Sequence, residues 1–470
     1  MPPFLALLLC MGFLWWLLRH DPAKTSEPSL AVWVPLIWIF IIASRLPSQW
    51  FGGGQTESAS ALEALQEGNP LDRTVFAILI LLAVGILISR SFSWGNFFAH
   101  NFFLAAFLLF ALMSVFWSDF SFVSFKRWFR DLGAYLVILV VLTDRRPLEA
   151  VSTILRRLCY LLIPISLLLI KYYPQMGKQY DFWIGTSVFV GATTSKNMLG
   201  VLCLVSGIFF FWDTVTRWPD RKERPIRRII FLNLAFIGMT LWLLHLADSA
   251  TSRVCLTLGC LVIAAAHRKS VKRNPFMLKL LIPASLCLYM ILQFGFGING
   301  ALAGLVGRNS TFTGRTELWN ILLGMHTNVL LGTGYESFWL GPRLQMIWAK
   351  FAVVNEAHNG YLEIYINLGL IGLFLLIGFL VSSYRMICGR LTPHSSFGSL
   401  SLALWTVLLF YNVTEAAFKG GQLMWLAFLL GAISVPARVK DEVRGAVAFD
   451  SPATAELLPS LSLEPTSLRR

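Results

Sequence analysis

Long apolar runs recur along almost the whole chain, and they constrain its fold more than any other feature of the sequence. The chain is 56% hydrophobic and 14% charged, with a mean hydropathy of +0.66. The runs show none of the alternation typical of barrel strands. We therefore predict an all-α polytopic membrane protein with about 12–13 transmembrane helices. The runs cover residues 4–18, 31–46, 74–90, 98–117, 129–143, 158–173, 198–212, 229–247, 254–267, 277–294, 361–384, 400–412 and 421–436.

The formal net charge of +14 is concentrated in alternate connections between these runs. Three connections, at residues 145–157, 217–228 and 268–273, are especially rich in Arg and Lys. The positive-inside rule and contacts with anionic lipid headgroups explain this pattern, so we do not infer nucleic-acid binding. With these connections in the cytoplasm, the long segment at 295–361 lies on the outer face of the membrane.

Composition divides the chain into three parts. Residues 1–180 hold the N-terminal transmembrane helices, residues 181–436 hold a transmembrane core, and residues 437–470 form a polar tail that we predict to be disordered in the cytoplasm. The first run lacks a basic start and a cleavage signal, which indicates a retained anchor. The seven cysteines lie mostly within apolar runs. A disulfide framework or a zinc cluster is therefore not expected.

The outer segment at 295–361 is the first candidate for chemistry, because membrane proteins keep such connections short unless they have a function. Within it, the imidazole of His358 has the pKa needed for proton transfer near neutrality. The side chains of Glu356, Asn359 and Glu363 can orient this ring. An ordinary surface histidine is the alternative.

Apolar residues recur at helical spacing from 318 to 330 and predict an amphipathic helix along the membrane surface. Three aromatic residues follow, Tyr335, Phe338 and Trp339. We interpret them as interfacial aromatics, with a sugar-stacking surface as the second possibility.

Several cations lie on the outer side by the same count of spans, where topology does not explain them. Arg127 and Arg130 stand one helical turn apart before the fifth run, and Lys196 stands at the start of the seventh. Arg308 lies in the outer segment. Arg253 follows a short polar turn and is predicted to point into the helix bundle. A bound polyanion is the simplest ligand, since phosphate suits the fork of arginine; contact with lipid headgroups is the alternative.

Several common catalytic signatures are absent from the sequence. It contains no D-x-D, Walker A, H-E-x-x-H or G-x-S-x-G motif. These motifs normally hold a metal, a nucleotide phosphate or a nucleophilic serine. We therefore expect an outward-facing site that uses neither a metal nor another cofactor. No outward carboxylate is an obvious nucleophile, so we expect direct displacement with inversion rather than a covalent intermediate.

Five motifs occur in the order typical of a known group of proteins. Together they resemble the O-antigen ligase and Wzy-type polysaccharide polymerase superfamily, and the exopolysaccharide-polymerase branch most of all. The likeness is clear over about residues 180–375 and rests only on hydropathy before that. The motifs are DFWIGTSVFVGATTSKNMLG (181–200), DSATSR (248–253), TGRTELW (313–319), LLGTGYESFW (330–339) and AHNGYLEIYINLGLIG (357–372).

The resemblance implies a fold similar to the C-type glycosyltransferases, in the bacterial inner membrane, with the active site facing the periplasm or cell exterior. It implies transfer of a glycan from undecaprenyl diphosphate to an acceptor hydroxyl. The implied partners are this lipid-linked oligosaccharide, an acceptor glycan and membrane lipids, with a chain-length regulator or flippase as protein partners.

The resemblance also implies roles for single residues. Arg253 and Arg315 match the two arginines of the family pattern and are expected to bind the diphosphate. His358 matches its loop histidine, as general base toward the acceptor or as hydrogen-bond donor to the leaving group. The residues expected to bind substrate are Lys196, Asn197, Arg127, Arg130, Arg308, Tyr335, Glu356 and Asn359.

Three functions stay open at this point. The resemblance of the KN and GRT segments favours a polymerase of lipid-linked repeats. A ligase that transfers the glycan to lipid A core or to a protein uses the same chemistry. A flippase for lipid-linked oligosaccharides would also bind a diphosphate, but the sequence shows no internal repeat of the kind common in transporters.

Overall fold

The computed structural model describes residues 1–21, 29–51, 68–90, 92–181, 185–268, 315–325, 327–351, 354–391 and 396–435, with short stretches between 271 and 285. The chain forms two compact units, Met1–Ser434 and Val435–Arg470. Residues 436–470 of the second unit lie outside the described residues. The description that follows concerns the first unit, whose predicted division at residue 180 stays a prediction.

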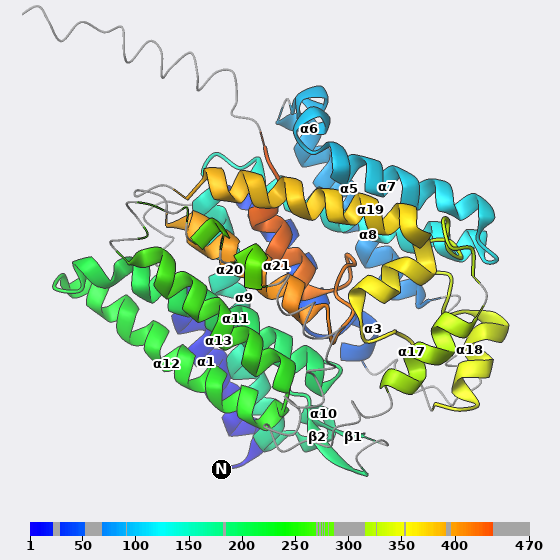
Figure 1. The fold of residues 1–470 in the computed structure, drawn as a ribbon. Coiled ribbons are helices and arrows are strands. Elements are labelled where there is room, and N and C mark those ends of the chain that lie inside the picture. Colours follow the sequence, from blue (N-terminus) through cyan, green and yellow to red (C-terminus); the bar gives the residue numbers. More distant parts are fainter. Residues whose placement is uncertain are drawn as a thin grey trace, which may run out of the picture. The chain divides into compact units, whose positions relative to one another are not determined.

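The described part of the first unit is built from helices and one antiparallel hairpin (Figure 1). The helices are α1 (Pro3–Arg19), η2 (Leu30–Val32), α2 (Trp33–Ala43), α3 (Pro47–Trp50), α5 (Pro70–Ser89), α6 (Trp94–His100), α7 (Phe102–Met113), η3 (Ser114–Trp117), α8 (Ser121–Leu142), α9 (Pro147–Tyr172), α10 (Pro174–Gly177), α11 (Lys196–Arg217), η4 (Trp218–Asp220), α12 (Arg224–Ala247), α13 (Ala250–His267), α17 (Arg315–Gly324), α18 (Gly341–Trp348), α19 (Gly360–Gly389), α20 (Phe397–Tyr411) and α21 (Leu423–Ala432). The hairpin pairs β1 (Lys178–Asp181) with β2 (Thr186–Phe189).

The predicted apolar runs coincide with these helices, which confirms the all-α polytopic class. Only the tenth run, at 277–294, lies mostly outside the described residues. Six helices are long and apolar enough to cross a membrane, namely α5, α9, α11 with η4, α12, α13 and α19. The pair formed by α6 and by α7 with η3, bent by 98°, would make a seventh. The other apolar helices, α1, η2 with α2, α20 and α21, are 10–17 residues long. Among the described residues, full-length spans are therefore fewer than the expected 12–13.

Helices α20 and α21 form the buried centre of the bundle. Almost all their side chains are buried, as expected for helices that are hydrophobic on every face. Helices α11 and α13 pack against α20 from one side, and α19 packs against α20 and α21 from another (Figure 1). The connection between α20 and α21 is thereby held close to the first residues of α11 and α19.

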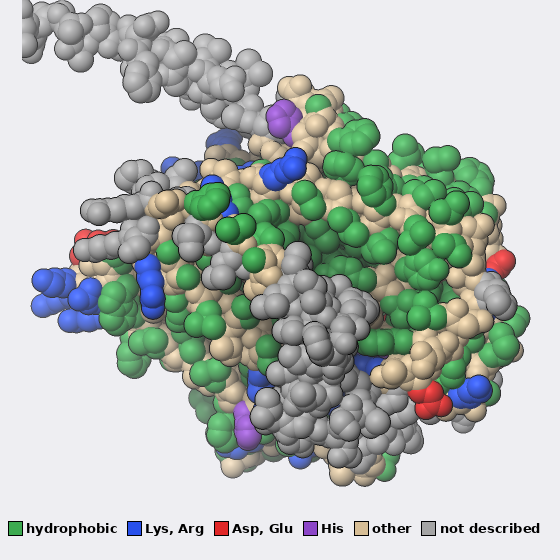
Figure 2. Space-filling model, viewed as in Figure 1, with side chains coloured by type: hydrophobic (Ala, Val, Ile, Leu, Met, Phe, Trp, Pro, Cys, Tyr) green, Lys and Arg blue, Asp and Glu red, His purple; other side chains and the backbone are tan. Residues whose placement is uncertain are grey.

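The basic connection at 217–228 lies at the end of α11 opposite Lys196. Arg221, Lys222 and Arg224 are exposed there, and Figure 2 shows Lys and Arg side chains gathered at the tip of the α11–α12 hairpin. The basic connection and Lys196 thus lie at opposite ends of α11, and the expectation that the basic end faces the cytoplasm stays a prediction. Elsewhere the visible face is largely apolar (Figure 2), as a lipid-facing surface should be.

The described part of the outer segment packs into a small core of its own. Leu318 and Leu322 of α17 are buried against Phe338 and Trp339, so the predicted amphipathic helix is present but ends at Gly324. Tyr335, Phe338 and Trp339 are 8%, 0% and 4% exposed. The prediction of interfacial aromatics or a stacking surface was therefore wrong, because Phe338 and Trp339 lie in the core of the segment and Tyr335 is buried with its hydroxyl bonded to Asp131 of α8.

The outer segment also inserts into α19. Gly369 adopts φ +65 inside this helix, and a Cβ there would lie only 2.2 Å from the Leu330 carbonyl oxygen. Just beyond the break, the backbone N–H of Leu370 donates to the carbonyl of Val329 at 2.9 Å. Only glycine permits this backbone conformation and this close approach together.

Candidate active site

Three connections that the sequence places on the outer side enclose a polar cavity of about 460 Å³. They are the start of α11, the loop before α19 and the connection between α20 and α21. The cavity is lined by Thr194, Ser195, Asn197, Met198, Val201, Val354, Asn355, Glu356, His358, Tyr411, Glu415, Ala416, Lys419 and Gln422. Its walls therefore mix carboxylates, cations and amides, as a site for a charged and hydroxylated ligand requires.

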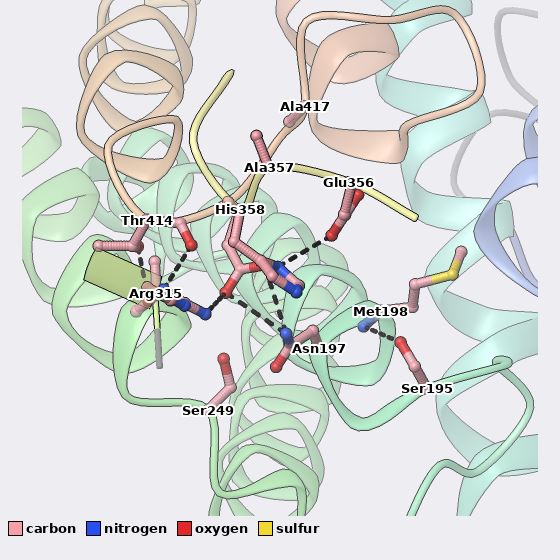
Figure 3. Close-up of polar contacts among 12 residues, drawn as sticks. Ser195, Asn197, Met198, Ser249, Arg315, Glu356, Ala357, His358, Thr414 and Ala417 are labelled. Atoms are coloured by element: carbon pink, nitrogen blue, oxygen red, sulfur yellow. Dashed lines mark hydrogen bonds and ion pairs between the residues drawn. The ribbon is translucent and has the colours of Figure 1, made fainter. Parts of the chain in front are cut away.

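His358 stands between two carboxylates in the cavity wall (Figure 3). Its Nδ1 lies 3.1 Å from Glu356 Oε1 and 3.5 Å from Glu415 Oε2. The backbone of His358 adopts a left-handed conformation, with φ +48. Such a conformation is uncommon for a non-glycine residue, and the surrounding contacts must hold it in place.

The first turn of α19 supplies those contacts. The side chain of Asn359 caps the helix by accepting hydrogen bonds from the backbone N–H groups of Tyr361 and Leu362 at 3.0 and 3.1 Å. The buried Glu363 accepts from the backbone N–H of Ala357 at 2.8 Å. Of the three residues expected to orient the imidazole, only Glu356 contacts it. Asn359 and Glu363 were wrongly expected to do so, because their oxygens bind the backbone on either side of His358.

Glu415 is the central carboxylate of the site. Its Oε1 accepts from Arg315 Nη2 at 3.1 Å, and the Asn197 Nδ2 lies 3.3 Å from both of its oxygens. Arg315 also donates from Nη1 to the Thr414 carbonyl at 2.6 Å (Figure 3). Glu415 thus joins α11, α17 and His358, and Arg315 is not among the residues that line the cavity.

The charges of this group are strongly coupled. Burial by itself opposes a charged imidazole, but the carboxylates of Glu356 and Glu415 outweigh it and raise the pKa of His358 to about 9. Burial likewise opposes the Glu356 carboxylate, while His358, Lys419 and Arg315 lower its pKa to about 2. At neutral pH, His358 is therefore an imidazolium. With Nδ1 facing the carboxylates, Nε2 is left as a proton donor, and the resting site does not contain a free histidine base.

Glu356, His358 and Glu415 can also be compared with the ligands that a metal ion requires. The ligand atoms of Glu356, His358 and Glu415 lie within 4.8 Å of one another, and carboxylates with an imidazole suit several divalent ions. A cation here would have to displace the His358 proton and compete with the Arg315 guanidinium for Glu415. The donor set fits a metal poorly, and metal-free chemistry stays a prediction.

A second group of charges adjoins the cavity through Lys419. The Lys419 Nζ lies 3.9 Å from Glu336 Oε2, and Arg127 donates to the backbone carbonyl of Glu336. The Arg130 Nε lies 3.4 Å from Asp131 Oδ1. The other oxygen of this carboxylate, Oδ2, accepts a hydrogen bond from the buried Tyr335 hydroxyl at 2.7 Å. The structure thus brings the predicted Arg127, Arg130 and Tyr335 together. Tyr335 was expected to bind substrate through its ring. That expectation was wrong, because Tyr335 is buried and donates its hydroxyl hydrogen bond to Asp131.

The remaining predicted residues differ in where they lie. Asn197 lines the cavity, and Lys196 is the first residue of α11 beside it. The Arg253 side chain is 43% exposed and pairs with Asp248, so the prediction that it points into the bundle was wrong; the rotation of α13 turns it outward. Arg308 lies outside the described residues.

Two residues of the site were missed, Glu415 and Lys419. Both lie in the short connection between two runs that contain no charge at all. An acid and a base in so short an outer connection form a signal that could have been found, since ionisable residues beside membrane spans mark functional sites. Two carboxylates, Glu356 and Glu415, line the cavity, and the expectation that no outward carboxylate acts as a nucleophile stays a prediction. Both carboxylates contact cations.

The fold and the site define a polytopic membrane protein with an acid–base cavity formed where α11 and α19 begin and α20 ends. Residues 182–377 match the O-antigen ligase family model, and the chain therefore contains an O-antigen ligase family domain. This match confirms the resemblance seen in the sequence motifs. The exopolysaccharide production protein ExoQ of Rhizobium meliloti (strain 1021) is 27% identical over 368 residues, which cover 73% of this chain and 79% of that protein.

Proposed function

We propose that the protein is a glycosyltransferase that polymerises undecaprenyl-diphosphate-linked oligosaccharide repeats into exopolysaccharide or O-antigen. The reaction would take place on the outer face of the bacterial inner membrane. The family domain and the likeness to ExoQ support a membrane enzyme that processes glycans. Within the site, the observation that carries the proposal is the position of the His358 ring, which lies against two carboxylates in the wall of the cavity.

The chemistry needs a stabilised leaving group. The bond between the anomeric carbon and the diphosphate oxygen breaks, and its electron pair stays on the diphosphate. The acceptor hydroxyl forms the new bond to the anomeric carbon and loses its proton. Negative charge therefore grows on the diphosphate, where a fixed proton donor lowers the barrier. His358, charged at neutral pH, suits this role better than that of a general base.

The proton that the acceptor hydroxyl loses must be taken up by a base, and a carboxylate of the cavity can accept it. Glu415 lines the cavity beside His358, and we assign it this role because the low pKa of Glu356 makes that residue a weak base. Arg315 and Asn197 fix the orientation of the Glu415 carboxylate. Both carboxylates lie against cations, which supports direct displacement with inversion at the anomeric carbon over covalent attack.

A ligase is the second candidate, because the family model is that of an O-antigen ligase. It would use the same donor, leaving group and cavity, and would differ only in the acceptor, a lipid A core or a protein. The likeness to an exopolysaccharide production protein favours the polymerase.

The test uses purified full-length protein in nanodiscs with undecaprenyl-diphosphate oligosaccharide as the only glycan. We expect a ladder of lengthening products from the wild type and none from His358→Ala. Lys350→Gln, which removes an exposed charge outside the cavity, should keep the ladder. Transfer that occurs only after a lipid A core or protein acceptor is added would establish the ligase instead. Movement of the lipid-linked glycan across the membrane without any transfer would refute both and establish a flippase.

A further inference from the structure

Among the residues that the structure describes, the cavity wall contains one lysine, Lys419, and no arginine. Arg315, one of the two arginines that the family resemblance assigns to the diphosphate, instead directs its guanidinium at the Thr414 carbonyl and at Glu415 (Figure 3). A diphosphate at Arg315 would have to displace both. Among the described residues of the wall, the positive charges are therefore those of Lys419 and of the protonated His358.

Lys419 is placed firmly on a tight turn. The backbone N–H of Gln422 donates to its carbonyl at 3.1 Å. The neighbouring Gly420 lies so close to α8 that a Cβ there would approach Ala134 and Asp131 to 3.1 Å. The side chain is 20% exposed. The backbone of Lys419 is therefore fixed, and its side chain forms part of the cavity wall.

The ammonium group of Lys419 has a distant counterion. Its Nζ lies 3.9 Å from Glu336 Oε2, beyond hydrogen-bond distance. Burial alone would favour the neutral amine, but Glu336, Glu363 and Glu356 raise the pKa of Lys419 and keep it charged. A compact ammonium with three donors suits a diphosphate whose charge shifts among its oxygens during reaction.

We propose that Lys419 binds the diphosphate of the lipid-linked donor beside His358, and that Arg315 is a positioning residue that acts by holding Glu415. The proposal rests on the function proposed above, because it takes its ligand from that reaction. Glu336 is then the resting counterion of Lys419, which the diphosphate replaces.

Binding of undecaprenyl diphosphate, without sugar or turnover, tests the proposal in nanodiscs. Undecaprenol, which lacks the diphosphate, measures the contribution of the lipid tail. Lys419→Gln should weaken binding of the diphosphate about 10–100-fold, as expected when one partner of a close charge pair is removed. Lys419→Arg, which keeps the charge, should remain within a few-fold of wild type. Arg315→Gln should leave affinity within about threefold while it slows glycan transfer. Lys350→Gln should have no effect.

A gain of affinity provides a readout that misfolding cannot imitate. Glu336→Gln removes the competing carboxylate and should strengthen diphosphate binding about threefold or more. Its backbone carbonyl, which accepts from Arg127, is unchanged.

Three results would overturn the proposal. One is a loss of affinity in Arg315→Gln equal to or larger than that in Lys419→Gln. Another is unchanged or weaker binding in Glu336→Gln. The third is a wild type that does not prefer the diphosphate over undecaprenol, which would refute the proposed function as well. A wild type that binds the diphosphate but extends no glycan would refute the polymerase alone, and the variants would still decide the role of Lys419.

Discussion

Replacement of Glu356 by Gln should move the pH dependence of catalysis in a direction that identifies the role of His358. Glu356 Oε1 lies 3.1 Å from His358 Nδ1, and the two carboxylates together raise the pKa of His358 from 6.5 to about 9. Glu415 remains in Glu356→Gln. We therefore expect the pKa of His358 to fall by about 1–2 units, which is the usual effect of one close charge.

The sign of the effect follows from the role of the proton. If His358 donates a hydrogen bond to the leaving diphosphate, the active form is the imidazolium. The wild-type rate then falls as pH rises through about 9, and the fall in Glu356→Gln begins about 1–2 units lower. At pH 8.5 the variant should retain only about a tenth of its rate at neutral pH.

The assay is the initial rate of glycan extension by purified protein in nanodiscs between pH 6 and 10, at saturating lipid-linked donor. Lys350→Gln serves as the matched control, because it also removes one charge from the outer segment. A histidine that acts as general base would give the opposite profile, with a rate that rises toward pH 9 in the wild type and rises earlier in Glu356→Gln. That result would refute the assignment of His358 as proton donor.

Three further predictions concern the support of the site. Arg45 donates to two carbonyls of the loop before α11, at 3.1 and 3.2 Å; Arg45→Ala should raise KM for the lipid-linked donor several-fold, and an unchanged KM in steady-state assays would contradict this. Tyr335→Phe removes the 2.7 Å bond to the buried Asp131 and should cost about 1–3 kcal/mol of stability in thermal unfolding; equal melting temperatures would show that this bond contributes little. EDTA should leave the rate of glycan extension unchanged, and a loss restored by a divalent ion would identify Glu356, His358 and Glu415 as metal ligands.

Helices were predictable from the sequence because an apolar run of this length has one physical solution in lipid. The runs at 198–212 and 361–384 correspond to α11 and α19 for this reason. Rotation of a helix about its axis was not predictable, and Arg253 therefore faces outward instead of inward. Composition likewise cannot separate aromatics at a membrane interface from aromatics in a small core, as at Trp339.

His358 and Asn197 were predictable as members of the site, but their relation to each other was not. They are joined through Glu415, which is more than 50 residues from His358 and more than 200 from Asn197 along the chain. Only the packing of α11, α19 and α20 brings these three ends together. A single sequence contains no signal for that proximity, although the charges of the connection between α20 and α21 could have been weighed.

The interruption of α19 at Gly369 has a mechanical consequence. The outer segment supplies, from Val329 and Leu330, the carbonyls that accept from the first N–H groups beyond the break, at 2.9 and 3.2 Å. These residues thus serve as the N-terminal cap of the second half of α19, after Gly369, while the first half begins at Gly360, two residues after His358. Any tilt of the second half must pull on this turn and, through Trp339 and Glu363, on the loop that holds the imidazole. A change in bilayer thickness that tilts this half of α19 would therefore move the loop that holds His358, without any ligand at a second site.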